Sequence, residues 1–282
     1  MKLNNKKQTI NNLIEKSITQ NGYCSEDIIS VKNELFKRIE NEPDPRMAFI
    51  GFCGVGKSST LNALFNAGQE ISHVRACTKE EKEIYGDYSE YLGSKGNVRV
   101  WDMPGMGEDI IADRKHLETY KKVLPFVDVA IWTIQADYRA MAPMQNTILM
   151  LQDTIGKDFI NKLLFAINKA DTIAPGETDW NMSFNIPSEE QQRNIIDFEN
   201  YVRSKIYQIL PKWKGDVVSY SAKRRFNLDT LLKAMVKASG SMRQWLLPEV
   251  ADVADPMEFI DPRYLQLIKS QLEKRRKGGD QA

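Results

Sequence analysis

The segment Gly51–Ser58, with the sequence Gly-Phe-Cys-Gly-Val-Gly-Lys-Ser, constrains this chain more than any other stretch. It matches G-x-x-x-x-G-K-[ST], in which glycines let the backbone turn tightly and bring N–H groups close to phosphate oxygens. Lys57 can reach the terminal phosphates, and the Ser58 hydroxyl can bind Mg²⁺. An apolar run precedes the segment at Met47–Ile50, and residues 59–65 after it are typical of a helix, whose N-terminal end favours an anion. We refer to Gly51–Ser58 as the phosphate loop.

The composition indicates an ordinary globular protein with one large domain and appendages. The chain has 282 residues, of which 42% are hydrophobic and 27% charged, and its formal net charge is +1. This charge provides no global field that would draw the chain to nucleic acid or to a membrane. No apolar run approaches the ~20 residues that span a bilayer, and no apolar core follows the basic N-terminus as it would in a secretory signal. We therefore expect a cytoplasmic protein with no transmembrane segment.

Short apolar runs alternate with helical patterns through the middle of the chain. Strands are expected at 47–50, 96–101, 127–134, 163–167 and 217–220, with another beginning at 84–85. Helices are expected at 59–65, 111–123, 143–153, from a capping box at Ser188–Gln191 to Pro211, and at 227–238. The alternation predicts an α/β fold with a doubly wound, mostly parallel sheet, in which ligands bind at the carboxyl ends of the strands. The phosphate loop, Asp102–Gly105, Asn168–Asp171 and Ser221–Lys223 all fall at such ends.

Helical extensions are expected on both sides of this domain. Residues 1–44 carry two amphipathic patterns, which suit a hairpin packed on the main domain or on the C-terminal segment, or else a partner-binding surface. Residues 265–272 suit a short helix that ends in the basic cluster 274–277, either a solvated helix end or a phosphate-binding patch. We predict a nucleotide-binding domain at 45–240 between helical extensions at 1–44 and 241–282.

The sequence Asn168-Lys169-Ala170-Asp171 directly follows a buried strand. A carboxylate such as Asp171 accepts both the N1–H and N2–H₂ donors of guanine, whereas adenine cannot satisfy it and leaves a buried charge unpaired. The N–H of Ala222 would suit the O6 acceptor of guanine. These residues argue for guanine and against ATP.

With these motifs in place, about residues 46–238 resemble a GTPase of the translation-factor-related class, in its Era-like branch. Ala76-Cys77-Thr78-Lys79 looks like a switch segment, Asp102-Met103-Pro104-Gly105 looks like D-x-x-G, and Asn168–Asp171 looks like N-K-x-D. The resemblance implies Mg²⁺ as cofactor, with ligands from Ser58, Thr78 (when the γ-phosphate is present) and Asp102 (through water). It also implies that the Gly105 N–H contacts the γ-phosphate. The nucleotide-binding residues that it implies are Gly51, Cys53, Gly54, Val55, Gly56, Lys57, Ser58, Ser59, Asn168, Lys169, Asp171, Ser221, Ala222 and Lys223.

Three stretches look like a narrower group, the YfjP/YeeP-type bacterial GTPases. They are Arg75–Thr78, Asp102–Glu108 and Ile134–Ala140. This likeness supports the fold and the nucleotide and implies little beyond them.

Two positions depart from the wider pattern. Met106 follows D-x-x-G where many GTPases place a glutamine that orients water, so we expect slow intrinsic hydrolysis. Gly54 stands where some Era-like relatives carry an asparagine linked to potassium activation, which puts that route in doubt. Arg75, alongside Lys57, Thr78 and Gly105 in the expected catalytic set, is either a helper or a solvated loop charge.

Two further side chains are expected to have structural positions and no role in the chemistry. We expect His116 to be a surface residue of a helix, and Trp180 to be a packed loop anchor more than a contact of the base.

We predict a Mg²⁺-dependent GTP-binding protein that hydrolyses GTP to GDP and phosphate as a molecular switch. The alternative is a nucleotide-stabilised assembly or membrane-associated module in the style of dynamin-like or immunity-related GTPases, with little intrinsic hydrolysis. The expected partners are guanine nucleotide, a second copy through the switch face, and a protein or ribonucleoprotein target that the sequence does not name.

Overall fold

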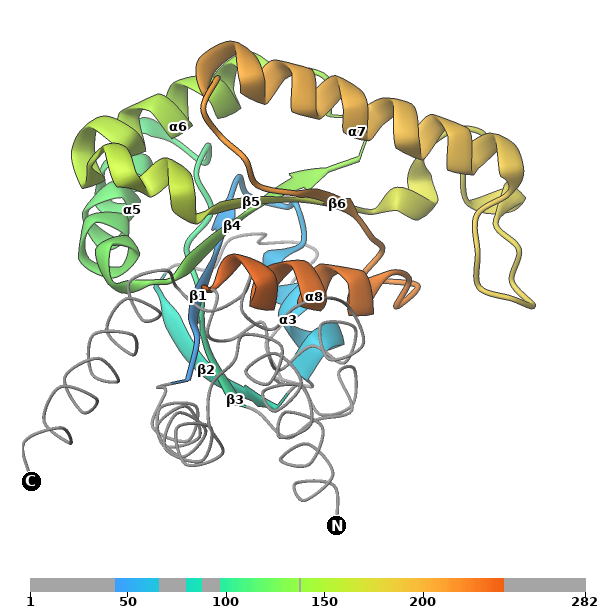
Figure 1. Ribbon diagram of the computed structural model, residues 1–282, viewed down its shortest axis with the longest axis horizontal. Coiled ribbons are helices and arrows are strands. Elements are labelled where there is room, and N and C mark those ends of the chain that lie inside the picture. The colour runs from blue at the N-terminus through green and yellow to red at the C-terminus, as the bar shows by residue number, and fades with distance from the viewer. Residues whose placement is uncertain (1–43, 66–79, 88–96, 137, 241–282) are drawn as a thin grey trace, which may run out of the picture.

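A six-stranded sheet organises the domain in the computed structural model, which describes residues 44–65, 80–87, 97–136 and 138–240 (Figure 1). The strand order is β2-β3-β1-β4-β5-β6. Only β2 runs antiparallel to its neighbour, and the other pairings are parallel. The predicted doubly wound, mostly parallel sheet is therefore confirmed. The strands are β1 (Arg46–Gly51), β2 (Lys82–Asp87), β3 (Asn97–Asp102), β4 (Val129–Gln135), β5 (Leu163–Asn168) and β6 (Val217–Ser219).

Helices cover both faces of the sheet. One face carries α5 (Ile110–Val123), α6 (Met141–Ile155) and α7 (Glu189–Ile209), and the other carries α3 (Lys57–Phe65) and α8 (Leu228–Ala238) (Figure 1). Short 3₁₀ turns occur at Leu124–Phe126, Lys157–Lys162, Ala170–Thr172 and Glu177–Asp179.

Each face of the sheet has its own hydrophobic cluster. In β1, Ala48 and Ile50 belong to the cluster beneath α5, α6 and α7, whereas Met47 and Phe49 belong to the cluster beneath α3 and α8. All six residues of β5 are buried, as expected for a central parallel strand covered by helices on both sides. This burial explains why the central strands are continuous apolar runs in the sequence.

Some predicted boundaries shift by a residue or two. The strand expected at 127–134 runs from Val129 to Gln135, and the helix expected from Pro143 begins at Met141, which leaves this proline in the first turn. Ser188 caps α7, since its hydroxyl accepts a hydrogen bond from the Gln191 N–H. The expected reciprocal half of the capping box is wrong, because the Gln191 side chain donates to carbonyls of the preceding loop instead.

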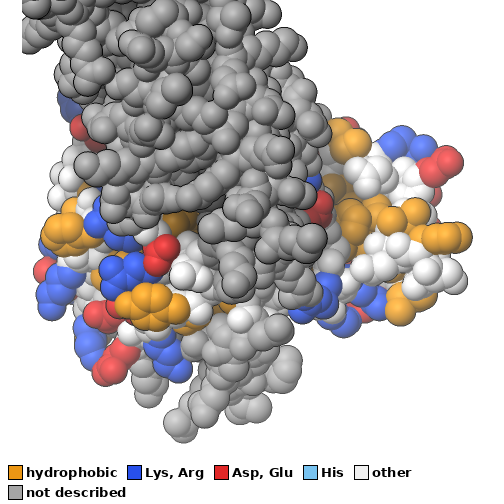
Figure 2. All heavy atoms as spheres, turned by 60° about the horizontal axis from the view of Figure 1, so that its bottom comes forward, with side chains coloured by type: hydrophobic (Ala, Val, Ile, Leu, Met, Phe, Trp, Pro, Cys, Tyr) orange, Lys and Arg blue, Asp and Glu red, His pale blue; other side chains and the backbone are white. Residues whose placement is uncertain are grey.

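A turn between Trp180 and Ile186 protrudes beside the N-terminal end of α7 (Figure 1). Its base is anchored by Trp180, which is buried and packs edge-to-face on Phe226, so the prediction of a packed loop anchor is confirmed. Its tip is exposed at Met182 and Phe184. Hydrophobic side chains are visible on the surface at this end of the molecule, at the right of Figure 2.

The expected extensions, residues 1–44 and 241–282, lie outside the described residues apart from Asp44, so the boundaries of 45–240 stay a prediction. Across the described part of the chain, no helix has the length and apolar character needed to cross a bilayer.

We expect Ile148→Ala in α6 to lower the free energy of unfolding by about 2–5 kcal/mol, because Ile148 is fully buried and its loss leaves a cavity. The matched control is Leu149→Ala, the next residue, which is 37% exposed and should change stability by about 0.5 kcal/mol or less. Urea denaturation measures both. Equal losses for the two variants would contradict the described packing of α6.

Candidate nucleotide site

The phosphate loop adopts a backbone that requires glycine at two of its positions. Gly51 and Gly56 have φ angles of 133° and 96°. A Cβ atom on Gly51 would lie 2.5 Å from the Thr133 carbonyl oxygen, and one on Gly56 would lie 2.2 Å from Asn168 Nδ2. The glycines therefore allow β1 to turn tightly into α3 while neighbouring strands stay close.

Lys57 begins α3 and turns its side chain back across the loop. Its Nζ donates to the carbonyl oxygens of Gly51, at 3.3 Å, and Phe52, at 2.9 Å. Burial lowers the pKa of Lys57 to about 8, although the nearby Asp102 carboxylate opposes this shift. A buried ammonium with neutral partners is stabilised by an anion, and a phosphate placed here would supply one.

Ser58 and Asp102 meet next to this lysine. The Ser58 hydroxyl donates to Asp102 Oδ2 at 2.6 Å, which joins the start of α3 to the end of β3. A hydroxyl and a carboxylate are the oxygen donors that Mg²⁺ prefers. The two residues therefore fit the predicted metal site.

The D-x-x-G segment lies directly against the phosphate loop. The Cys53 N–H donates to the Met106 carbonyl, and the Met106 N–H donates to the Gly51 carbonyl. A Cβ atom on Gly105 would lie 2.8 Å from Cys53 Cα, so this glycine permits the close approach. The Met106 side chain is 3% exposed and packs in the core, which agrees with the expectation that it does not position water.

Side chains of helix α5 form hydrogen bonds with the backbone of the D-x-x-G segment and of Gly107. His116 Nδ1 lies 3.1 Å from the Gly105 carbonyl oxygen, and the Tyr120 hydroxyl donates to the Pro104 carbonyl. Asp113 accepts a hydrogen bond from the Gly107 N–H. The prediction that His116 is a surface residue is wrong: it is 4% exposed, because it shares the buried face of α5 with Tyr120, four residues on.

Asn168, at the end of β5, joins three loops with one side chain. Its Nδ2 donates to the Val55 carbonyl in the phosphate loop at 3.0 Å. Its Oδ1 accepts from the Lys169 N–H at 2.8 Å and from the Ala222 N–H at 3.1 Å. The Ala222 N–H, which the sequence predicts as a donor to guanine O6, therefore donates to Asn168 in this structure.

Lys169, in the N-K-x-D segment, extends its side chain towards the phosphate loop. It adopts a left-handed backbone (φ 64°), and its Nζ donates to the Gly54 carbonyl and to Gln135 Oε1. Burial lowers its pKa, while Asp171 opposes that shift.

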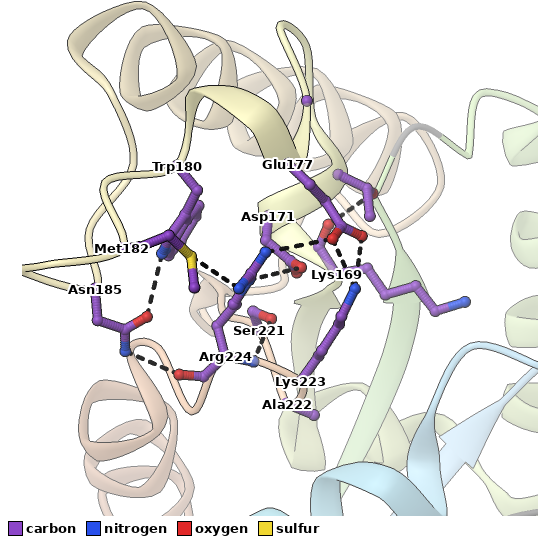
Figure 3. A network of polar contacts seen from close by, with 12 residues as sticks. Lys169, Asp171, Glu177, Trp180, Met182, Asn185, Ser221, Ala222, Lys223 and Arg224 are labelled. Atoms are coloured by element: carbon purple, nitrogen blue, oxygen red, sulfur yellow. Dashed lines mark hydrogen bonds and ion pairs between the residues drawn. The ribbon is translucent and has the colours of Figure 1, made fainter.

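Asp171 is a buried carboxylate whose two oxygens have no hydrogen-bond partner among the described residues. Arg224 Nε lies 3.6 Å from Oδ2, which is an ion pair without a hydrogen bond (Figure 3). A ligand that offers two adjacent N–H donors would satisfy both oxygens. Gln191 holds the backbone here through its bonds to the Asp171 and Ile173 carbonyls.

The structure brings together every predicted nucleotide and metal residue that it describes, with Ser59 in the first turn of α3 and Ser221 accepting from the Arg224 N–H. The predicted Arg75 and Thr78 lie outside the described residues. Sequence reasoning missed Glu177, Gln191 and Arg224. Arg224 directly follows Ser221–Lys223 and could have been noticed as a cation beside an expected buried carboxylate. The capping-box pattern marks Gln191 only as part of a helix start, and no sequence signal marks Glu177.

Residues 46–169 match the family model described as 50S ribosome-binding GTPase. Residues 46–169 are therefore similar to this GTPase family, and the described residues have the P-loop GTPase fold.

Similar proteins extend this result at the level of sequence. The chain is 32% identical over 175 residues to the uncharacterized protein YfjP of Escherichia coli (strain K12), a match that covers 61% of this chain and 54% of YfjP. It is 34% identical over 155 residues to YkfA of the same organism, covering 54% of this chain and 49% of YkfA. The chain thus spans about half the length of these curated relatives. The expected likeness to YfjP-type proteins is confirmed.

Solved structures show the same fold at low sequence identity. Era of Aquifex aeolicus, bound to GDP and AlF₄⁻, has a TM-score of 0.51 at 23% identity, covering 68% of this chain and 56% of that one. Toc33 of Arabidopsis thaliana, in complex with Mg²⁺ and GMPPNP, has a TM-score of 0.52 at 16% identity, covering 78% of this chain and 94% of that one.

The lowered pKa of Lys57 predicts pH-dependent stability for the nucleotide-free protein. The lysine pKa is 10.5 without the fold and about 8 within it. Between these values the unfolded chain holds a proton that the folded chain has released, so the free energy of unfolding rises with pH. We expect a gain of roughly 2 kcal/mol between pH ~7.5 and pH ~9.5, measured by urea denaturation, and Lys57→Met should remove it.

The control is Lys115→Met, which replaces an exposed lysine of α5 and should keep the wild-type gain. The upper limit avoids Tyr120 and Tyr220, whose pKa values burial raises further above the ordinary tyrosine value. The same gain in Lys57→Met as in the wild type would contradict the assignment.

Proposed function

We propose that this chain binds guanine nucleotide with Mg²⁺, hydrolyses GTP to GDP and phosphate, and acts as a nucleotide-controlled switch. The observation that carries the proposal is Asp171, a buried carboxylate with two unsatisfied oxygens. It lies three residues after Asn168, whose side chain is bonded to the phosphate loop. Guanine and its phosphates would therefore be bound by parts that are already joined.

On the phosphate side, the chain's own groups have separate tasks. The backbone N–H groups of the phosphate loop and the Lys57 ammonium would bind the β- and γ-phosphate oxygens. Ser58, and Asp102 through water, would hold Mg²⁺, which when bound offsets the negative charge of the phosphates. Their present hydrogen bond at 2.6 Å shows that both side chains face the same point.

Hydrolysis requires a water in line with the bond between the γ-phosphorus and the leaving oxygen. Attack by this water breaks that bond and releases GDP and phosphate. Since the Met106 side chain is buried in the core, it supplies no group to the water. We therefore expect slow intrinsic hydrolysis, with backbone groups or Arg75 assisting.

The switch depends on groups whose contacts form only when the γ-phosphate is present. We assign this role to the Gly105 N–H and the Thr78 hydroxyl, which would draw two segments towards GTP and release them with GDP. A second copy of the chain through this face, and a protein or ribonucleoprotein target, are the partners that we propose. Two similar proteins have such partners: Era has been solved in complex with nucleotides of 16S ribosomal RNA, and dimerization is important for the GTPase activity of the chloroplast translocon components atToc33 and psToc159.

The base assignment is tested by Asp171→Asn. This change removes the charge and turns an N–H donor towards the donors of guanine, so GDP affinity should fall about 100-fold or more. Fluorescence titration with labelled GDP measures the loss, with unlabelled ATP as a competitor that should fail to displace the label. The matched control is Asp179→Asn, a nearby exposed aspartate, which should bind GDP as the wild type does. Tighter binding of ATP than of GTP by the wild type would overturn the base assignment.

Turnover is tested by Arg75→Ala, which should lower the GTP hydrolysis rate about tenfold or more, because a cation that stabilises the developing charge is lost. GDP affinity should not change. Single-turnover hydrolysis is followed over a range of protein concentrations, and a rate that rises with concentration supports activation by a second copy. Arg193→Ala, an exposed arginine of α7, is the control. Wild-type turnover in Arg75→Ala would remove this residue from the mechanism.

A further inference from the structure

Two short turns meet beside Asp171 and form the outer wall of the base side (Figure 3). One turn is closed by a bridge between Asn181 and Ile186, and the other by a bridge between Ser221 and Phe226. The first follows N-K-x-D in the chain, and the second contains Ser221–Lys223. The two predicted base-contacting segments therefore reach each other through these turns.

A ring contact and two hydrogen bonds hold the buried part of the two turns together. Trp180 packs edge-to-face on Phe226, with ring centroids 5.0 Å apart. Asn185 accepts a hydrogen bond from the Trp180 indole N–H and donates to the Arg224 carbonyl. These contacts fix the position of the Arg224 backbone.

Nearer to Asp171, ion pairs hold the two segments together. Lys223 Nζ lies 2.8 Å and 2.7 Å from the two carboxylate oxygens of Glu177. Arg224 Nη2 lies 3.3 Å from Glu177 Oε2, while its Nε faces Asp171. Glu177 thus holds two consecutive cations of the second turn, and one of them also pairs with the predicted guanine acceptor.

Exposure differs along this cluster. The side chains of Lys223 and Glu177 are 63% and 41% exposed, whereas that of Arg224 is 17% exposed. The Lys223 hydrogen bond lowers the pKa of Glu177. Exposed pairs of this kind are individually weak and are screened by salt. The cluster can therefore open and close under ordinary conditions.

We propose that Glu177, Lys223 and Arg224 form an ionic clasp that closes the base side of the nucleotide site and sets the rate at which guanine nucleotide dissociates. The proposal rests on the proposed function, because it places the base between Asp171 and Ser221–Lys223. For the base to leave, the turn at 221–226 has to move away from Asp171, and Glu177 opposes that movement. Glu177 is a positioning residue in this scheme, since it acts through the two cations and touches no nucleotide.

The test is the dissociation rate of fluorescently labelled GDP, followed after adding excess unlabelled GDP. Glu177→Gln should release GDP about 3- to 10-fold faster than the wild type at low ionic strength. The difference should shrink in ~1 M salt, because screening weakens the wild-type clasp as well. Asp179→Asn, in the same 3₁₀ turn and with the same change of charge, should release GDP at the wild-type rate.

A double-mutant cycle separates the clasp from a direct contact of Lys223 with the nucleotide. If Lys223 acts through Glu177, Lys223→Gln should speed release in the wild type and have little further effect in Glu177→Gln. Thermal unfolding of the nucleotide-free variants monitors the fold independently. A merely structural role of Glu177 would lower thermal stability without changing the salt dependence of release.

Two failures are distinguishable. If the wild-type chain does not bind labelled GDP, the proposed function is overturned, and the clasp with it. If the wild type binds GDP and Glu177→Gln releases it at the wild-type rate in low salt, the clasp alone is overturned.

Discussion

The amide side chain of Asn168 is the contact on which the rest of the site depends. From the end of β5, it bonds to the carbonyl of Val55, to the N–H of Lys169 and to the N–H of Ala222. The loops that follow different strands are linked by these bonds, and the bond from Lys169 Nζ to the Gly54 carbonyl adds to them. Because the amide offers both a donor and an acceptor, one residue fixes the phosphate side relative to the base side. A nucleotide that spans both sides would then meet loops that are already joined.

Buried charges are arranged so that a ligand completes them. Lys57 is surrounded by carbonyls of the phosphate loop, and Asp171 has no hydrogen-bond donor among the described residues. Each arrangement costs free energy in the empty protein, since burial removes the ion from water and the nearby opposite charges, Asp102 for Lys57 and Arg224 for Asp171, compensate this loss only in part. A phosphate at one end and a pair of N–H donors at the other relieve both costs. The same groups that give affinity therefore make the empty domain less stable than its core alone would allow.

Much of this domain was predictable because its signals are local in the sequence. Local patterns predict the apolar strand at Leu163–Ile167, the turn at the glycines of the phosphate loop and the strand-end motifs. A parallel sheet then brings the ends of the strands together. Other features depend on contacts between distant residues. Whether His116 is buried depends on which face of α5 meets the sheet, and nothing near Glu177 in the sequence indicates that Lys223, 46 residues later, lies against it.

The two ends of the site are built from interactions of different kinds, and this has a consequence for control. Backbone hydrogen bonds and buried side chains hold the phosphate side, where a change of one group disturbs Gly51, Cys53 and Met106 together. The outer wall of the base side is held by partly exposed ion pairs around Glu177, which respond to salt and to other charges. In the proposed scheme, the buried phosphate end would set the affinity for the phosphates, while the partly exposed ion pairs would set how long a nucleotide stays. A partner that altered only the charges around Glu177 could speed exchange without disturbing the groups assigned to hydrolysis.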